Sequence, residues 1–347
     1  MSSAAICGEP YLFHLWFSNG IVTAEVVNAE LQTTFAVRDY DLAATLDSGQ
    51  AFRWQLREGA WEGVIGQRWV RLHQHSAIAA KNDRGARGVA AGGHRVGFGT
   101  IEARVARPVS DWRWLETCLQ TSVSLPAVLA AFPDDAPMRA AVAACHGLRL
   151  LRQDPWECLA SFLCSATKQI VQIRQIIALL CERFGEAVAV PHGHMPAFTF
   201  PAANRIAALT EADLRTCKLG FRAPHVLAAA RQVVSGQLNL DQLATLSTEF
   251  ARNELVKLSG VGPKIADCVL LFAYGRQDAF PRDVWVNRAL RELYFPRRRP
   301  TPARLREFAR THFGPFAGFA QQYLFHYIRV HLRPRNGQDH RRRDAIS

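Results

Sequence analysis

Several familiar sequence signals are missing from this chain of 347 residues. Its eight cysteines include no C-x-x-C pair, and most lie in apolar helical stretches, which indicates buried thiols in a reducing compartment and argues against a disulfide framework or a zinc site. No apolar run approaches transmembrane length. No basic residue precedes Cys7, and the apolar stretch 11–17 is short and contains His14, so no signal peptide is expected. We therefore expect a soluble intracellular protein that holds no metal.

Charge of one sign is present in excess. Lysine and arginine number 42 against 30 aspartates and glutamates, which gives a formal net charge of +12 and an isoelectric point near 9.8. Each Lys or Arg set against a phosphate releases condensed counterions, so the surplus favours a polyanion as partner, although a merely basic surface gives the same balance. The length is sufficient for two domains or one large one.

The pattern of alternating residues predicts β-structure near the N-terminus. Phe52, Trp54 and Leu56 alternate with polar or small residues, and turn signals separate two further short strands at 60–65 and 68–72. Glycine and arginine are frequent from 81 to 108, which predicts an exposed loop. We expect an N-terminal extension over 1–30, whose order the sequence does not decide, and an antiparallel β-rich domain over 31–125 that contains this loop.

Beyond this region the sequence becomes helical. Asp154-Pro155-Trp156-Glu157 supplies an N-cap, a proline at the first helical position and a capping-box glutamate. An apolar stripe at helical spacing then continues to Gly185. We expect further helices at 223–235, 248–258, 264–274, 284–294, 302–313 and 316–329. The fold class is therefore α+β, with an all-α domain over 126–332 and a basic tail over 333–347.

The segment 258–268, L-S-G-V-G-P-K-I-A-D-C, carries the most specific signal. Pro263 opens a helix, and Gly260 and Gly262 permit backbone conformations that a β-carbon would hinder, so that N–H groups around Val261 can face outward. Such donors beside a helix N-terminus bind phosphate. The pattern predicts a helix-hairpin-helix that contacts DNA; a tight turn between two helices is the simpler alternative.

Lys264 and Asp283 are the predicted catalytic pair. Lys264 lies in the first turn of the second hairpin helix, where it could simply reach a phosphate, yet the positive end of the helix dipole disfavours an ammonium, and a partly neutral amine is a nucleophile. Asp283 is expected to cap a helix that starts at Val284. A carboxylate facing the same cleft can also stabilise the positive charge that develops on a sugar as its base departs.

Together, the hairpin, the lysine and the distal aspartate resemble the helix-hairpin-helix DNA glycosylase superfamily. Three further segments resemble its 8-oxoguanine DNA glycosylase family: S-G-Q-A-F-R-W at 48–54, the central helix from 150 to Ser165, and the C-terminal helix from 314 to Phe325. The resemblance runs over about 42–329. It implies a bifunctional glycosylase and AP lyase, of the lysine type without an iron–sulfur cluster or other cofactor. Such an enzyme flips and excises 8-oxoguanine-type purines from duplex DNA in base excision repair.

The resemblance also implies roles for individual residues. Lys264 matches the lysine that attacks C1′ and forms a Schiff base, and Asp283 matches the aspartate that supports base loss. Gly49 matches the glycine whose carbonyl accepts from N7–H, a donor that guanine lacks. The other positions implied at the base are Cys268 and Phe325, which sandwich it, Gln321, which reads its pairing edge, and Pro281.

Positions against the DNA are implied in the same way. Gly260, Val261 and Gly262 match the phosphate-binding hairpin, Phe221 an aromatic wedge, Arg222 an arginine that contacts the cytosine left behind, and Thr167 the residue that fills the vacated stack. Each residue also has an ordinary alternative. Cys268 and Phe325 suit a helix core, and Gly49 suits a turn.

The chain departs from the family at several positions. Thr167-Lys168-Gln169 stands where the family has an asparagine run, and Gln172 replaces a second arginine that reads the opposite cytosine. Trp285 replaces a phosphate-contacting histidine, and Ile328 replaces that histidine's aspartate partner. The chemistry is left intact, while the preference for the opposite base is in question.

Three alternatives follow from the same residues. An alkylpurine glycosylase of the superfamily does not use a lysine at position 264. An endonuclease III-like or adenine-mismatch glycosylase would carry four clustered cysteines after the catalytic domain, and none occurs here after Cys268. A non-catalytic hairpin module leaves Lys264, Asp283 and Gly49 unexplained. We expect a monomer that acts on duplex DNA containing oxidised guanine and binds no membrane, cytoplasmic with the nucleoid in a bacterium and nuclear in a eukaryote.

Overall fold

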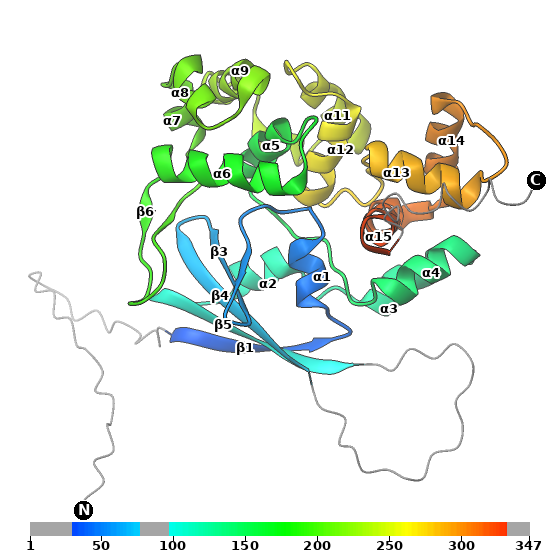
Figure 1. The fold of residues 1–347 in the computed structure, drawn as a ribbon, viewed down its shortest axis with the longest axis horizontal. Coiled ribbons are helices and arrows are strands. Elements are labelled where there is room, and N and C mark those ends of the chain that lie inside the picture. The colour runs from blue at the N-terminus through cyan, green and yellow to red at the C-terminus, as the bar shows by residue number, and fades with distance from the viewer. Residues whose placement is uncertain (1–29, 77–96, 332–347) are drawn as a thin grey trace, which may run out of the picture.

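The computed structural model describes residues 30–76 and 97–331, which form an antiparallel sheet followed by a set of helices (Figure 1). The predicted α+β class is confirmed. Within the described residues, no helix is both long and apolar enough to cross a membrane. Residues 1–29 of the expected N-terminal extension and the expected basic tail lie outside the described residues, whereas Glu30 begins the first strand of the sheet.

The sheet has five strands in the order β1-β5-β4-β3-β2, and neighbouring strands are antiparallel. Its strands are β1 (Glu30–Arg38), β2 (Gln55–Arg57), β3 (Ala60–Ile65), β4 (Arg68–Ser76) and β5 (Phe98–Val109). The two later strands of the predicted meander are confirmed, whereas the first begins only at Gln55, because Phe52 and Trp54 are buried in the approach to the strand. Strand β1 was not predicted.

The loop expected over 81–108 is wrong in its last part. Residues 98–108 belong to β5, which pairs with both β1 and β4. Ile101, Ala103 and Val105 alternate along this strand and are buried, the period-two pattern of a strand with one covered face. The frequent glycines and arginines concealed that alternation. Residues 81–96 lie outside the described residues.

One face of the sheet packs against α1 (Leu42–Asp47) and α2 (Arg113–Leu119). Asp41 caps α1 by accepting from the Ala44 N–H at 2.8 Å. Leu42 and Leu46 of α1 join the buried cluster that includes Leu72 and Ile101 from the sheet. Helix α1 therefore ends where the 48–54 motif begins, and the packing of the sheet fixes its position.

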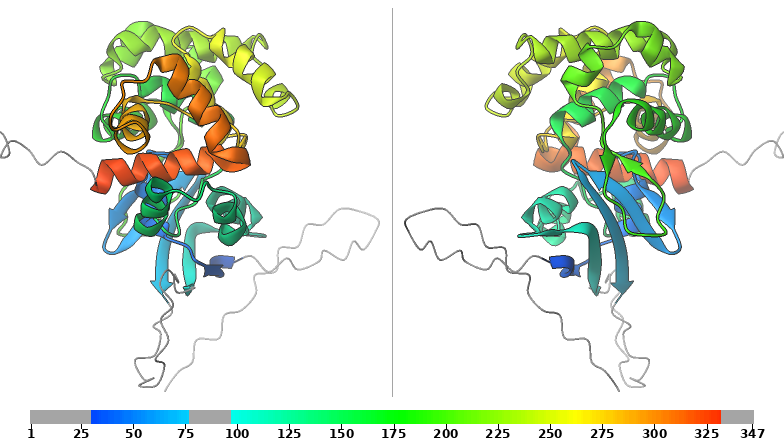
Figure 2. Two further views of the ribbon diagram at one scale, coloured as in Figure 1. Left: turned by 90° about the vertical axis from the view of Figure 1, so that its right-hand side faces the viewer. Right: turned by 90° about the vertical axis from the view of Figure 1, so that its left-hand side faces the viewer.

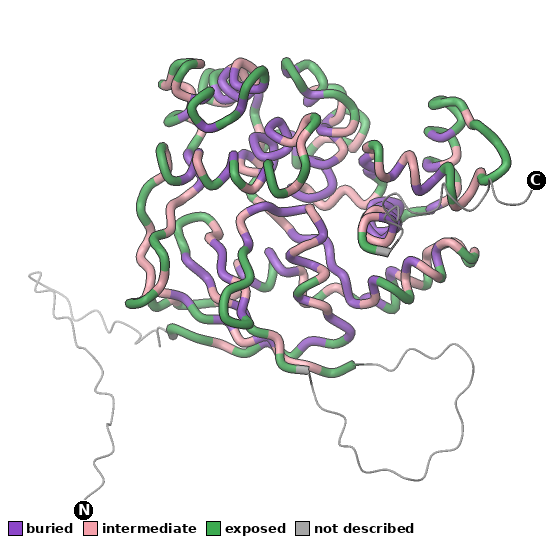
Figure 3. Tube along the Cα trace, in the orientation of Figure 1, coloured by how far each residue is buried: buried purple, intermediate pink, exposed green. Residues whose placement is uncertain are grey.

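The helices form the second and larger part of the molecule (Figures 1 and 2). They are α3 (Leu125–Ala130), α4 (Ala136–Ala144), α5 (Pro155–Cys164), α6 (Ile170–Phe184), α7 (Ala203–Ala207), α8 (Glu211–Thr216), α9 (Ala223–Val234), α10 (Leu240–Leu243), α11 (Thr248–Val256), α12 (Pro263–Phe272), α13 (Val284–Ala289), α14 (Pro302–His312) and α15 (Ala317–His331). The six helices predicted after position 222 are all present, the fourth of them continuing as a π-helix over Leu290–Tyr294. Helices α5 and α12 pack together and are largely buried (Figure 3).

The start of α5 corrects one detail of the sequence reading. Asp154 caps the helix as predicted, accepting from the Glu157 N–H at 2.8 Å. The Glu157 carboxylate does not complete a capping box. It accepts from the Arg53 guanidinium instead, at 3.1 Å, because Arg53 reaches it from the segment before β2. This pair ties the 48–54 motif to α5.

Replacing Glu157 by alanine should therefore lower the free energy of unfolding by about 3 kcal/mol, because the Arg53 side chain, 10% exposed, loses its countercharge. Urea denaturation measures the effect. Arg57→Ala is the control, since the exposed Arg57 side chain donates to Gln55 and should change the value by no more than about 0.5 kcal/mol. Equal effects for the two variants would show that the ion pair does not stabilise the fold.

Candidate active site at the helix hairpin

The hairpin between α11 and α12 requires glycine at one position. Gly260 has a φ of +81°, and a Cβ there would lie 2.7 Å from Cγ of His225 on α9. The expectation for Gly262 is wrong in part. Its φ is −95°, and no atom lies within 4 Å of the Cβ position, so its backbone needs no glycine. What distinguishes Gly262 is open space above its Cα at the start of α12.

Lys264 is half-buried in the first turn of α12 and is directed at the end of α5. Its Nζ donates to Ser165 Oγ at 3.1 Å and lies 5.1 Å from the centroid of the Phe162 ring. Ser165 is the C-cap of α5 and donates in turn to the Phe162 carbonyl at 2.7 Å. The negative end of the α5 dipole thus faces the lysine.

Asp283 caps α13, as predicted. Its Oδ1 accepts from the Val286 N–H at 2.8 Å. Burial raises the pKa of Asp283, and the Val286 N–H and the positive charge of Lys264 oppose that rise. The lysine on α12 and the carboxylate before α13 therefore act on each other electrostatically, although they come from separate helices.

The predicted base-binding residues come from α12, α15 and the loop before α13. Cys268 is buried one turn after Lys264, and burial raises the pKa of its thiol to about 12, so the thiol stays protonated at neutral pH. Pro281 is buried, and Phe325 is half-buried. Gln321 is 4% exposed, and its Oε1 has no hydrogen-bond partner among the described residues. A buried amide acceptor without a partner is costly in a folded protein, which marks it as available for a ligand.

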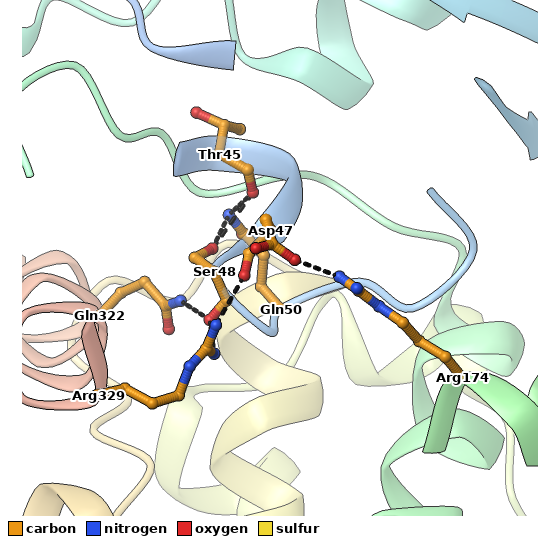
Figure 4. Close-up of polar contacts among 7 residues, drawn as sticks. All are labelled: Thr45, Asp47, Ser48, Gln50, Arg174, Gln322 and Arg329. Atoms are coloured by element: carbon orange, nitrogen blue, oxygen red, sulfur yellow. Dashed lines mark hydrogen bonds and ion pairs between the residues drawn. The ribbon is translucent and has the colours of Figure 1, made fainter. Parts of the chain in front are cut away.

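Gly49 joins this group through the turn after α1, whose neighbouring residues Asp47, Ser48 and Gln50 are drawn in Figure 4. Its φ is +83°, and a Cβ there would lie 2.6 Å from Ile170 Cδ1, 2.9 Å from Arg329 Nη1 and 3.4 Å from Phe325 Cε1. Glycine is therefore required both by the backbone and by the close approach. The structure brings Gly49 and Phe325 into contact although they are at opposite ends of the sequence.

The predicted DNA-facing residues are arranged less simply. Phe221 is 56% exposed, as a wedge should be. Arg222 is only 3% exposed, and its guanidinium donates to the carbonyls of Ala166 and Leu219 and, at 2.6 Å, to Thr167 Oγ1. A contact between Arg222 and a cytosine would require these bonds to exchange.

The loop that Arg222 holds is itself unusual. Thr167 has a φ of +57°, a left-handed conformation that is strained for a β-branched residue. Gln172 is occupied as well, because its Oε1 accepts from the Gln169 N–H at 3.1 Å in a capping box at the start of α6. Thr167 and Gln172, two of the positions at which the chain departs from the family that it resembles, thus have structural contacts of their own.

Two site contacts were not anticipated from the sequence. In the sequence, Ser165 has no predicted role beyond the end of the central-helix motif, yet its hydroxyl accepts a hydrogen bond from Lys264. Arg329 appeared only as the end of a helix, yet it touches the Gly49 turn. Helical spacing could have identified Arg329, because Gln321, Phe325 and Arg329 follow one another at intervals of four and share one face of α15.

The remaining surface carries no comparable constellation. Among residues 30–76 and 97–331, no group of three or more His, Cys, Asp or Glu side chains could hold a metal ion. A groove of about 880 Å³ lies between α6 and strands β2 to β4, and it reaches Asp47 and Arg174 but none of the predicted catalytic residues. The hairpin, α13, α15 and the Gly49 turn are therefore the candidate site.

Comparison with known proteins identifies two adjoining family models. Residues 33–159 match the N-terminal domain of 8-oxoguanine DNA glycosylase, and residues 160–315 match the HhH-GPD superfamily of base excision DNA repair proteins.

Individual relatives agree with these matches. The N-glycosylase/DNA lyase OGG1 of Arabidopsis thaliana is 30% identical over 300 residues, which is 82% of this chain and 76% of that protein. A probable N-glycosylase/DNA lyase of Methanothermobacter thermautotrophicus is 31% identical over 204 residues, or 53% of this chain, and the match spans 64% of that protein's length. The solved 8-oxoguanine glycosylase/lyase of Clostridium acetobutylicum, in complex with double-stranded DNA containing cytosine opposite 8-oxoguanine, superposes with a TM-score of 0.73. It is 27% identical and covers 87% of this chain and 98% of its own.

The raised pKa of Asp283 generates a stability prediction. A folded-state pKa above the unfolded value means that the ionised carboxylate opposes folding at neutral pH. Asparagine retains the capping acceptor without the charge. We expect Asp283→Asn to melt at a higher temperature than the wild type at neutral pH, and the difference to shrink as the pH falls through the raised pKa. Thermal unfolding at a series of pH values measures this.

Asp111→Asn is the control, because the pKa of Asp111 is shifted in the opposite direction to that of Asp283. Asp111 is exposed, and its bonds from Arg113 lower the pKa of its carboxyl. Its substitution should give no gain in melting temperature at neutral pH. A gain equal to that of Asp283→Asn would contradict the burial argument.

Proposed function

Because this chain belongs to the 8-oxoguanine DNA glycosylase family, we propose that it is a bifunctional N-glycosylase and AP lyase that removes 8-oxoguanine-type purines from duplex DNA in base excision repair. The observation that carries the proposal is that Lys264 on the hairpin helix and Asp283 at the start of α13 act electrostatically on each other and on the buried Cys268 thiol. A nucleophile and a carboxylate in one cleft are what a lysine-type glycosylase needs.

Recognition begins with the phosphate backbone. The net charge of +12 attracts DNA, and the open space above Gly262 lets a phosphate approach the N-terminus of α12. The target base must leave the stack, which costs a few kcal/mol. The exposed ring of Phe221 is suited to enter the helix as the base leaves.

The flipped base then lies between Cys268 and Phe325. The Gly49 carbonyl accepts the N7–H of 8-oxoguanine, whereas guanine presents a lone pair at N7 and is repelled. The unpartnered Oε1 of Gln321 accepts from the donors on the pairing edge of the base. The lack of a hydrogen-bond partner for Gln321 Oε1 among the described residues supports this role. A buried acceptor contributes most binding free energy with a ligand that supplies the missing donor.

The chemistry follows from the two catalytic side chains. The Lys264 amine attacks C1′ as the bond from C1′ to the base breaks, and the bonding electron pair leaves with the base. The ionised Asp283 stabilises the positive charge that develops on the sugar. The amine nitrogen loses a proton and the C1′–O4′ bond breaks as O4′ takes up a proton, which gives a Schiff base at C1′ of the opened sugar. Loss of a proton from C2′ then expels the 3′ phosphate and cleaves the strand. The bond from Lys264 to Ser165 holds the amine at the end of α5 before attack.

Partner and location form part of the proposal. The substrate is duplex DNA with an oxidised guanine, the enzyme acts as a monomer, and it works with the nucleoid in a bacterium or in the nucleus in a eukaryote. The cytosine opposite 8-oxoguanine in the Clostridium acetobutylicum complex supports the choice of duplex. An alkylpurine glycosylase is the second candidate, and Lys264 distinguishes the two, since direct hydrolysis needs no amine.

Borohydride trapping on an 8-oxoguanine duplex tests the proposal. The wild type should form a covalent adduct, and Lys264→Gln should abolish both the adduct and base excision while DNA binding persists, because glutamine cannot form an imine. Lys257→Gln is the matched control, since Lys257 is exposed at the end of α11 and pairs with Glu254. An adduct that persists in Lys264→Gln would remove the nucleophile assignment; a wild type without excision or adduct would remove the function.

The base opposite the lesion gives a second test. Arginine only donates hydrogen bonds and so suits the acceptors of cytosine, whereas Gln172 can donate or accept. We expect excision to be fastest opposite cytosine, with a margin that Gln172→Arg widens, because a good polar contact discriminates by about 1–3 kcal/mol. Single-turnover excision opposite each of the four bases measures the margin.

Gln175→Arg adds the same charge one turn further along α6 and serves as the control. If Gln172→Arg leaves the margin unchanged, another residue such as Lys168 reads the opposite base. If Gln175→Arg widens it equally, added charge and not position accounts for the change.

A further inference from the structure

The guanidinium of Arg329 lies beside Gly49 and Phe325, two of the residues proposed for lesion recognition. Arg329 Nη1 donates to the Ser48 carbonyl at 3.2 Å, and Nη2 donates to the Asp47 carbonyl at 2.9 Å (Figure 4). Nη1 also lies 2.9 Å from where a Cβ of Gly49 would be. The Cζ of Arg329 is 5.4 Å from the centroid of the Phe325 ring.

The turn before Gly49 needs these donors. Helix α1 ends at Asp47, and its last carbonyls have no N–H of a following turn to pair with, while the helix dipole makes this end negative. Gly49 leaves the helix in the left-handed region. Gln322 supplies one donor to the Ser48 carbonyl at 3.1 Å. Arg329 supplies a donor to each of two successive carbonyls together with a positive charge.

The opposite side of Gly49 is fixed independently. Gln50 is fully buried, and its Nε2 donates to the carbonyls of Thr45 at 2.8 Å and Arg149 at 2.7 Å. Its Oε1 accepts from the Leu151 N–H at 2.7 Å. Loss of Arg329 therefore leaves the turn attached to the core. On the flank that precedes Gly49 it removes the donor to the Asp47 carbonyl and a donor to the Ser48 carbonyl, where Gln322 remains.

Discrimination between 8-oxoguanine and guanine depends on that flank. The two bases differ at N7 by one donor, so a carbonyl rejects guanine only while it is held against N7 and cannot turn away. We propose that Arg329 is a positioning residue for lesion discrimination, which holds the Gly49 carbonyl and the Phe325 ring in one fixed relation. This inference rests on the proposed function.

Binding by Arg329→Met in an otherwise uncleaving Lys264→Gln protein tests the inference. The preference for an 8-oxoguanine duplex over the matching guanine duplex should fall roughly tenfold, the scale of one charge-assisted hydrogen bond. Affinity for the guanine duplex should stay within about twofold, because the phosphate contacts are elsewhere. The melting temperature, measured alongside, shows whether the variant is folded.

Two further variants sharpen the result. Arg310→Met removes an exposed charge from α14 and should leave the preference intact. Arg329→Lys keeps the charge but has a single donor group. In the Lys264→Gln background, its preference for the 8-oxoguanine duplex should therefore be closer to that of Arg329→Met than to that of the protein with Arg329 intact.

The positioning role of Arg329 would be wrong if folded Arg329→Met kept the full preference for the 8-oxoguanine duplex. It would also be wrong if Arg329→Lys restored that preference completely. These binding measurements are made only after the protein with Lys264 intact has been shown to excise 8-oxoguanine. If the protein with Lys264 intact shows no excision, the proposed function is wrong, so the failure of the proposed function is distinguishable from the failure of this inference.

Discussion

The buried amide of Gln50 is the constraint on which the site depends. It pairs with backbone groups of Thr45, Arg149 and Leu151, which come from α1 and from the segment that leads into α5. A buried amide is stable only when its polar atoms are paired, so the side chain fixes the distance between the two segments. Gly49 is thereby placed against α15 and the start of α6, although it belongs to the segment that precedes the sheet's meander.

The proposed catalytic pair is held by helix ends and not by a rigid salt bridge. Asp283 is fixed by the first turn of α13, and Lys264 is fixed between the start of α12 and the end of α5. Burial opposes the ionised form of Asp283, so the site keeps a carboxylate that the fold alone would not favour. Such a cost is common where a side chain is retained for chemistry and not for stability.

Recognition and opposite-strand contacts are organised differently in this chain. Gln321, Phe325 and Arg329 lie along one face of α15, so a single helix orders residues that are proposed to lie around the base. Arg222, in contrast, is turned into the loop that contains the strained Thr167. The residues proposed to hold the base therefore already lie on one helix face in the free protein, whereas the proposed contact of Arg222 with the opposite strand requires rearrangement of this loop.

The sequence by itself determined the α+β class, the helices after position 222, the caps at Asp154 and Asp283, and the location of Lys264 at the start of a helix. These features depend on residues that are close together in the chain, so periodicity and capping patterns in the sequence predict them. The strand over Phe98–Val109 and the partner of Glu157 were decided only by tertiary structure, because each depends on a segment far away in sequence. The same holds for the inward turn of Arg222 and for the contact of Arg329 with the Gly49 turn, since a side chain's direction is set by the neighbours that folding brings to it.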